Sequence, residues 1–163
     1  MTIPEMLDRI GGAKQVKRRA IRAPQALNEA YEYDQPSSFS RGLRIDLNGL
    51  VILLISGTAS VNERGQSVHA GDFRAQCRRT YRNITDLLAS EGATWKDIVR
   101  TTCYLRDIER DYAAFNEERT AFFKEQGLDP LPASTGIQAI LCRPELLVEI
   151  EAIAMFIPPP EET

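Results

Sequence analysis

The segment Leu147–Phe156 has the strongest strand pattern in the chain. Its residues alternate in character, and alternate residues of a β-strand point to opposite faces of the sheet. One face is entirely apolar and consists of Val148, Ile150, Ala152, Ala154 and Phe156. The other face carries Glu149 and Glu151 beside Ile153 and Met155, and charged groups are costly in a dry core. This strand must therefore pack one face into a core and leave the other at a partly wet surface.

A tight β-hairpin is predicted nearer the start of the chain. Apolar and polar residues alternate over 43–47, Asn48-Gly49 follows, and 50–55 is an uninterrupted apolar run. Asn-Gly suits the positive φ angles of a two-residue turn. Ser56-Gly57-Thr58 then ends the second strand, and a loop is expected over 62–71.

Two amphipathic helices are also predicted. Asp72 can cap the first, which ends at Gly92. Its inward residues recur at intervals of three and four and are Phe73, Cys77, Thr80, Ile84, Leu87 and Leu88. The second helix ends at 127–130, and its inward residues are Tyr112, Phe115, Phe122 and Phe123.

Two further strands complete the predicted sheet, at 98–105 and 133–141. The first has Val99, Thr101, Cys103 and Leu105 on one predicted face, with Ile98, Arg100, Thr102 and Tyr104 on the other. The order ββαβαββ is typical of an α+β two-layer sandwich, with a mixed sheet and two helices on one face. The uncovered sheet face mixes apolar and charged residues, so we expect self-assembly to cover it.

Length and charge limit the domain count and the partners. The 163 residues suit one compact domain, which we place at 36–157, between an N-terminal extension at 1–35 with some helix and a solvated Pro/Glu tail at 158–163. With 20 basic and 23 acidic residues the net charge is -3, so no nucleic-acid partner is expected. The apolar runs are too short for a membrane helix, and the first ten residues lack a signal-peptide pattern. We therefore expect no membrane partner and a cytoplasmic location.

No metal or cofactor is expected from the sequence. Cys77, Cys103 and Cys142 are widely spaced and match neither a disulfide framework nor a zinc site. His69 is the single histidine, so a histidine-rich metal centre is excluded. We expect three free thiols, most of them buried.

Four motifs resemble a known family. They are Leu54-Ile55-Ser56-Gly57, Ile98-Val99-Arg100-Thr101-Thr102 with Leu105-Arg106-Asp107, Phe115-Asn116 with Phe122-Phe123, and Val148-Glu149-Ile150-Glu151-Ala152-Ile153-Ala154. With these motifs the stretch from Ser37 to Phe156 resembles the Rid family of YjgF-like reactive-intermediate deaminases, whose members were once called translation inhibitors or endoribonucleases. The resemblance implies a chorismate-mutase-like fold and a homotrimer whose sheets form a central barrel. It also implies a small-molecule ligand in each intersubunit cleft.

The resemblance implies a substrate site that is altered at two positions. In deaminating members, an arginine two residues after the proline that opens the fourth strand binds the carboxylate of a small 2-imino or enamino acid. Here Ser134 follows Pro132 at that distance, and a serine offers one neutral donor where arginine offers a charged, bidentate fork. Phe39 replaces the usual tyrosine of the cleft and lacks its hydroxyl group. We therefore expect the substrate specificity of this pocket to be shifted away from 2-iminopropionate.

The other site residues follow from the same resemblance. Glu149 is expected to be the catalytic residue, because it occupies the family's water-positioning site. The expected substrate-binding residues are Phe39, Gly57, Asn116, Ser134, Thr135 and Gly136. Glu149 and Glu151 share a strand face, where each can perturb the protonation of the other. The alternative role for this pair is structural ion pairing around a trimer axis, with Arg100 as partner.

Arg119 joins the substrate-binding candidates on its position alone. It lies on the apolar face of the second predicted helix, so its guanidinium must either be paired or reach the cleft. The alternative is a side chain at the rim of the helix layer, with a carboxylate nearby. Arg41, Arg44 and Arg143 are further candidates for the missing anchor, and surface exposure is the alternative for each.

Two functions from different classes fit these observations. The first is a trimeric hydrolase of an imine, enamine or related conjugated acid, with weak or no 2-iminopropionate deaminase activity. The second is a noncatalytic small-molecule-binding trimer that acts as a sensor or carrier, since fold does not fix chemistry. Action on RNA has only the older family names in its favour, because a lone histidine cannot form a two-histidine acid/base pair.

Overall fold

The computed structural model describes residues 16–159. Within this range, one mixed sheet has the strand order β1-β2-β3-β6-β4-β5. The strands are β1 (Lys17–Ala20), β2 (Gly42–Leu47), β3 (Leu50–Ala59), β4 (Ile98–Leu105), β5 (Ala133–Gln138) and β6 (Val148–Phe156). Neighbouring strands are antiparallel except β4 and β5, which are parallel.

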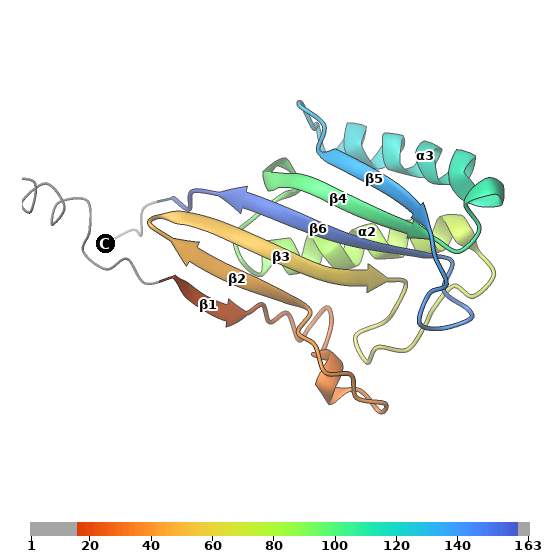
Figure 1. Ribbon diagram of the computed structural model, residues 1–163, viewed down its shortest axis with the longest axis horizontal. Coiled ribbons are helices and arrows are strands. Elements are labelled where there is room, and N and C mark those ends of the chain that lie inside the picture. Colours follow the sequence, from red (N-terminus) through yellow and green to blue (C-terminus); the bar gives the residue numbers. More distant parts are fainter. Residues whose placement is uncertain (1–15, 160–163) are drawn as a thin grey trace, which may run out of the picture.

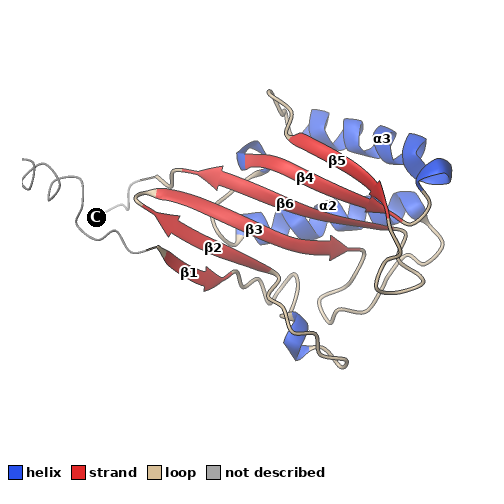
Figure 2. Ribbon diagram, in the orientation of Figure 1, coloured by secondary structure: helices blue, strands red, loops and turns tan. Residues whose placement is uncertain are grey.

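Two helices cover one face of this sheet, as Figures 1 and 2 show. They are α2 (Phe73–Ala89) and α3 (Ile108–Glu125), and short 3-10 turns lie at Ala30–Glu32 and Trp95–Asp97. Asp72 caps α2 through the backbone N–H of Ala75, as expected, and Asp107 caps α3 in the same way. The α+β two-layer sandwich expected from the sequence is confirmed.

The core lies between the sheet and the two helices. Cys77, Ile84 and Leu87 of α2 are fully buried, as are Val148 and Ile150 of β6. An aromatic cluster closes one end of this layer, where the rings of Tyr81 and Phe122 stack with their centroids 4.5 Å apart. The alternation predicted for β6 is confirmed, since Val148, Ile150, Ala152 and Ala154 are buried and Phe156 is partly buried, while Glu151 and Met155 on the other face are exposed.

The face pattern predicted for β4 is wrong at its first two residues. Ile98 is buried in the core and Val99 is exposed, the reverse of the expectation. The cause is a register shift between Ile98 and Arg100 where β4 pairs with β6, because a bulge adds one residue and reverses the alternation beyond it.

Other boundaries also differ from the sequence-based expectations. β3 continues to Ala59, past a second register shift between Ile55 and Thr58, and the expected strand 133–141 ends at Gln138. Tyr112, expected to point inward, is 46% exposed. Its ring lies beside Gly136 of β5. Because β5 is the last strand at this edge of the sheet, no further strand of the described chain covers the ring.

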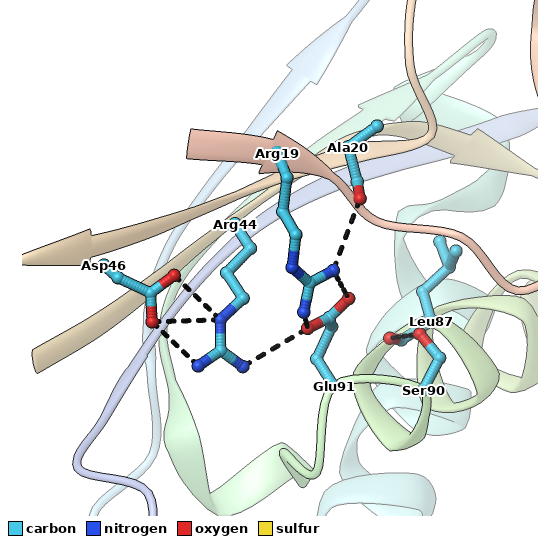
Figure 3. A network of polar contacts seen from close by, with 7 residues as sticks. All are labelled: Arg19, Ala20, Arg44, Asp46, Leu87, Ser90 and Glu91. Atoms are coloured by element: carbon cyan, nitrogen blue, oxygen red, sulfur yellow. Dashed lines mark hydrogen bonds and ion pairs between the residues drawn. The ribbon is translucent and has the colours of Figure 1, made fainter. Parts of the chain in front are cut away.

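The predicted N-terminal extension contributes a strand to the sheet. Its first fifteen residues, and the last four of the predicted tail, lie outside the described residues. β1 pairs with β2, and Glu91 after α2 fixes it to the helix layer by accepting two hydrogen bonds from Arg19. The same buried carboxylate accepts a hydrogen bond from Arg44, which also pairs with Asp46 (Figure 3).

Candidate functional site

Three of the expected site residues converge on one cavity of about 120 Å³. Phe39 precedes β2, Gly57 lies in the irregular part of β3, and Glu149 is the second residue of β6. β3 and β6 are neighbours in the sheet, and Glu149 is paired with Ala59 of β3. The pairing of these two strands therefore brings Gly57 and Glu149 together.

The carboxylate of Glu149 lies directly over Gly57. A Cβ atom built on Gly57 would be 2.1 Å from Oε1 of Glu149, so a glycine is required for the carboxylate to take this position. Burial raises the pKa of Glu149, the nearby charge of Arg41 opposes that rise, and Glu151 adds to it. The cavity thus holds a carboxyl group whose proton is retained to higher pH than usual.

Arg41 supplies a buried cation to the same cavity. Its guanidinium lies over two aromatic rings, 4.4 Å from the centroid of Phe39 and 5.3 Å from that of Tyr33. The residue is only 5% exposed, and its Nε has no hydrogen-bond partner within the described part of the chain. Burial lowers the pKa of this guanidinium, while Tyr33, Glu29 and Glu149 act in the opposite direction.

A second cavity, of about 480 Å³, contains three other expected site residues. Asn116 and Arg119 come from α3, and Ser134 comes from β5. Arg119 donates hydrogen bonds to Oδ1 of Asn116 at 2.7 Å and to Oγ of Ser134 at 3.4 Å. Its guanidinium also lies 5.1 Å from the ring centroid of Phe115. An arginine side chain from α3 is therefore held beside Ser134 of β5.

Ser134 is further held by the strand next to it. Thr101 of β4 donates a hydrogen bond to Ser134 Oγ over 3.0 Å, and the Cys103 thiol lies 3.9 Å from the same oxygen. Thr135 and Gly136 lie exposed on β5 and line neither of the two cavities. Thr135 accepts a hydrogen bond from Arg100, the residue expected to pair with Glu151.

The remaining arginine candidates have structural partners. Arg44 is tied to Asp46 and Glu91, away from both cavities. Arg143 does line the smaller cavity, where its guanidinium donates to the carbonyl of Gly65 and the hydroxyl of Ser67. These contacts hold the loop after β3 in place.

Tyr33 is a cavity residue that the sequence did not indicate. Its ring packs against Gly65, where a Cβ atom would lie 2.3 Å from the ring, and its ring centroid lies 5.3 Å from the guanidinium of Arg41. Tyr33 falls in the predicted N-terminal extension, which shows no periodic pattern. The one available signal was an aromatic residue shortly before Phe39 and Arg41.

The structure offers no metal site among residues 16–159, where His, Cys, Asp and Glu nowhere form a group of three able to hold an ion. All three cysteines are free; Cys77 and Cys103 are buried and Cys142 is exposed. In the same range, neither helix has a stretch that could span a bilayer.

Comparison with known proteins identifies similar sequences. A family model described as endoribonuclease L-PSP matches residues 34–156. The chain is 32% identical over 111 residues to 2-iminobutanoate/2-iminopropanoate deaminase of Escherichia coli K12, which covers 68% of this chain and 83% of the relative. It is 33% identical over 103 residues to 3-aminoacrylate deaminase RutC of Acinetobacter baylyi, covering 63% of this chain and 78% of the relative.

Solved structures show the same arrangement of elements. A Rid-family protein of unknown function, YyfA from Yersinia pestis, superposes with a TM-score of 0.69 at 28% identity, covering 85% of this chain and 98% of the other. The crystal structure of the YjgF gene product from E. coli gives a TM-score of 0.66 at 28% identity, covering 83% and 97%. These matches agree with the sheet and helix layers described above.

Proposed function

The chain belongs to the endoribonuclease L-PSP family, the Rid or YjgF family, and from this premise we propose that it hydrolyses the C=N bond of a small imino or enamino acid. Two relatives carry deaminase names, for 2-iminobutanoate or 2-iminopropanoate and for 3-aminoacrylate. The observation that carries the proposal is the partly buried Glu149 carboxyl group over Gly57, in a cavity that also holds a cation.

In the proposed reaction Glu149 positions and deprotonates a water molecule. The water oxygen forms a bond to the imine carbon, and the imine nitrogen takes the proton that Glu149 removed from the water, which gives a carbinolamine. Glu149 then removes the remaining hydroxyl proton and passes it to the nitrogen as the C–N bond breaks, so ammonia leaves and the carbon keeps the oxygen as a ketone. The raised pKa of Glu149 suits this exchange, because an acid/base group acts best when its pKa approaches the working pH.

We propose that the active unit is a homotrimer. The two cavities share no lining residue within one chain, and a cleft between neighbouring subunits joins them into one site. The sheet face opposite the helices supports association, because it exposes Leu54 and Met155 and contains a hollow lined by Arg100 and Glu151. Light scattering is expected to give three times the chain mass, and a stable monomer at micromolar concentration contradicts this assembly.

Arg119 is the proposed carboxylate anchor of the second cavity. It brings a guanidinium to Ser134, but from α3 rather than from β5, so the bound acid lies in a different position from that in an arginine-bearing relative. For this reason we expect weak or no turnover of 2-iminopropionate, and faster turnover of another imino or unsaturated acid.

The test uses imino acids generated in solution by an amino acid oxidase, with loss of the imine followed over its uncatalysed decay. Glu149→Gln is expected to lower turnover about a hundredfold or more, the usual effect of a missing general base. Arg119→Gln should raise KM for acidic substrates, whereas Arg78→Gln, which removes a surface arginine paired with Glu118, should change neither constant. Turnover that survives Glu149→Gln contradicts the mechanism.

Binding without turnover supports the noncatalytic alternative. Ser134 favours it, because it stands where the sequence resemblance implies an arginine, and a hydroxyl group cannot supply the charge-assisted fork. A trimer that binds small acids but accelerates hydrolysis of no imine in the series is then a sensor or carrier.

A further inference from the structure

We infer that Arg41 binds a second acidic group of the substrate, so that this chain acts on imino acids with two carboxylates. The inference rests on the proposed function, in which Arg119 binds the first carboxylate. It concerns a different residue in a different cavity, the one that contains Glu149.

Arg41 is a buried cation with hydrogen-bonding capacity to spare. Its side chain forms neither an ion pair nor a hydrogen bond with any residue in 16–159, and its Nε is fully enclosed without a partner. A buried donor left unpaired destabilises the structure, and the effect is larger when the group is charged. A ligand that enters the cavity with an acceptor reduces this destabilisation, and an anionic ligand removes most of it.

Two aromatic rings restrict where that acceptor can lie. The guanidinium of Arg41 lies over the rings of Phe39 and Tyr33 within cation–π range. The rings hold the group in place without using its N–H donors, which lie at its edge. A planar, held fork of this kind suits a carboxylate better than a single neutral acceptor.

Within residues 16–159, neither neighbouring carboxylate forms an ion pair with the guanidinium of Arg41. Glu29 accepts from the backbone N–H of Arg41, and its other carboxylate oxygen is buried without a partner. Glu149 lines the same cavity but forms no ion pair with Arg41 among the described residues. The arginine and the proposed catalytic carboxyl group therefore line one cavity without pairing with each other, so a substrate in this cavity can contact both.

The size of the cavity limits the substrate. At about 120 Å³ it is smaller than the roughly 300–1,000 Å³ of sites for drug-sized ligands. One short acidic arm fits beside Glu149, with the imine carbon near the carboxyl group and the other carboxylate directed to Arg119 across the subunit boundary. This geometry selects short dicarboxylic imino acids over 2-iminopropionate, which has a single carboxylate.

The inference is tested with two stable acids of equal carbon number, succinate and butyrate. Isothermal titration calorimetry of the assembled wild-type protein should show succinate binding about tenfold or more tightly than butyrate, as one charge-assisted contact provides. Arg41→Gln should reduce succinate affinity to that of butyrate, and Arg41→Lys should retain part of the preference. Arg78→Gln, which removes a distant surface arginine, should leave the preference unchanged.

Each outcome separates this inference from the proposed function. Equal affinities in the wild type, no measurable binding of either acid, or a preference that survives Arg41→Gln all overturn the role of Arg41. If Arg41→Gln weakens both acids equally, it is the sole anchor and the second-carboxylate inference is wrong. A succinate preference lost in Arg41→Gln, together with no imine hydrolysis, supports the anion site and contradicts the enzyme proposal.

Discussion

Replacing Gly57 by alanine is expected to displace the carboxylate of Glu149, the proposed catalytic group, while leaving the fold intact. The new Cβ atom would lie 2.1 Å from Glu149 Oε1 and 3.0 Å from its Cδ. Since a Cβ atom does not approach closer than 3.0 Å to a non-bonded heavy atom, the carboxylate oxygen must move away by about 1 Å. A misplacement of that size can cost about a hundredfold in rate.

Stability should not fall in this variant. The atom that must move is the end of a flexible side chain, and Gly57 does not have a positive φ. Alanine in a compatible conformation stabilises by about 0.4–1 kcal/mol through the unfolded chain. The expected result is therefore a loss of turnover of about a hundredfold, with an unchanged or slightly higher melting temperature.

A double-mutant cycle provides the control for this experiment. In a Glu149→Gln background the base is already absent, so Gly57→Ala should lower the rate little further, and the two effects should not add. Assays follow imine hydrolysis and thermal melting on the same preparations. Near-wild-type turnover of Gly57→Ala, or full additivity with Glu149→Gln, would refute the positioning of the carboxylate by this glycine.

Three further predictions follow from burial and charge. Because burial raises the pKa of Glu149, its ionisation opposes folding. The melting temperature of Glu149→Gln should therefore equal that of the wild type near pH 4 and exceed it by a growing margin as the pH rises. A difference in melting temperature that stays constant across pH contradicts this. Glu91→Ala should lower the free energy of unfolding in urea by about 1–3 kcal/mol, because it removes the buried carboxylate shared by Arg19 and Arg44. Glu117→Ala, which removes one partner of an exposed ion pair, should lower it by less than about 1 kcal/mol. The protein should leave RNA intact in a nuclease-free preparation. RNA cleavage that co-purifies with the protein and disappears in Glu149→Gln contradicts the proposal that the protein hydrolyses imino acids.

Local patterns predicted most of the fold. The Asn48-Gly49 turn has positive φ at both residues, 55° and 87°, as the dipeptide indicates. The apolar face of β6 and the N-cap of α2 are also as expected. The two bulges were not predicted, because an extra residue in a ladder depends on how strands pair rather than on which residue types occur.

The site was predictable only in part, for a related reason. Glu149 and Gly57 lie in motifs of β6 and β3, and the structure brings them together. Tyr33 and Arg41 meet Glu149 through the path of an irregular segment before β2, and such contacts between distant residues leave no periodic signal. Arg119 was indicated by its conflict with an apolar helix face, but its contact with Ser134 depends on how α3 lies over β5.

The position of β1 has a consequence for how the protein resists aggregation. A sheet that ended at β2 would offer free backbone N–H and C=O groups along Gly42–Leu47, where Leu43 is partly exposed, and such an edge can pair with any other extended chain. β1 occupies that position and carries Lys17, Arg18 and Arg19 in succession, of which Arg19 is paired with Glu91. The positive charges of Lys17 and Arg18 repel a second copy of the same strand. The short basic segment thus helps to keep one molecule's sheet from growing into the next.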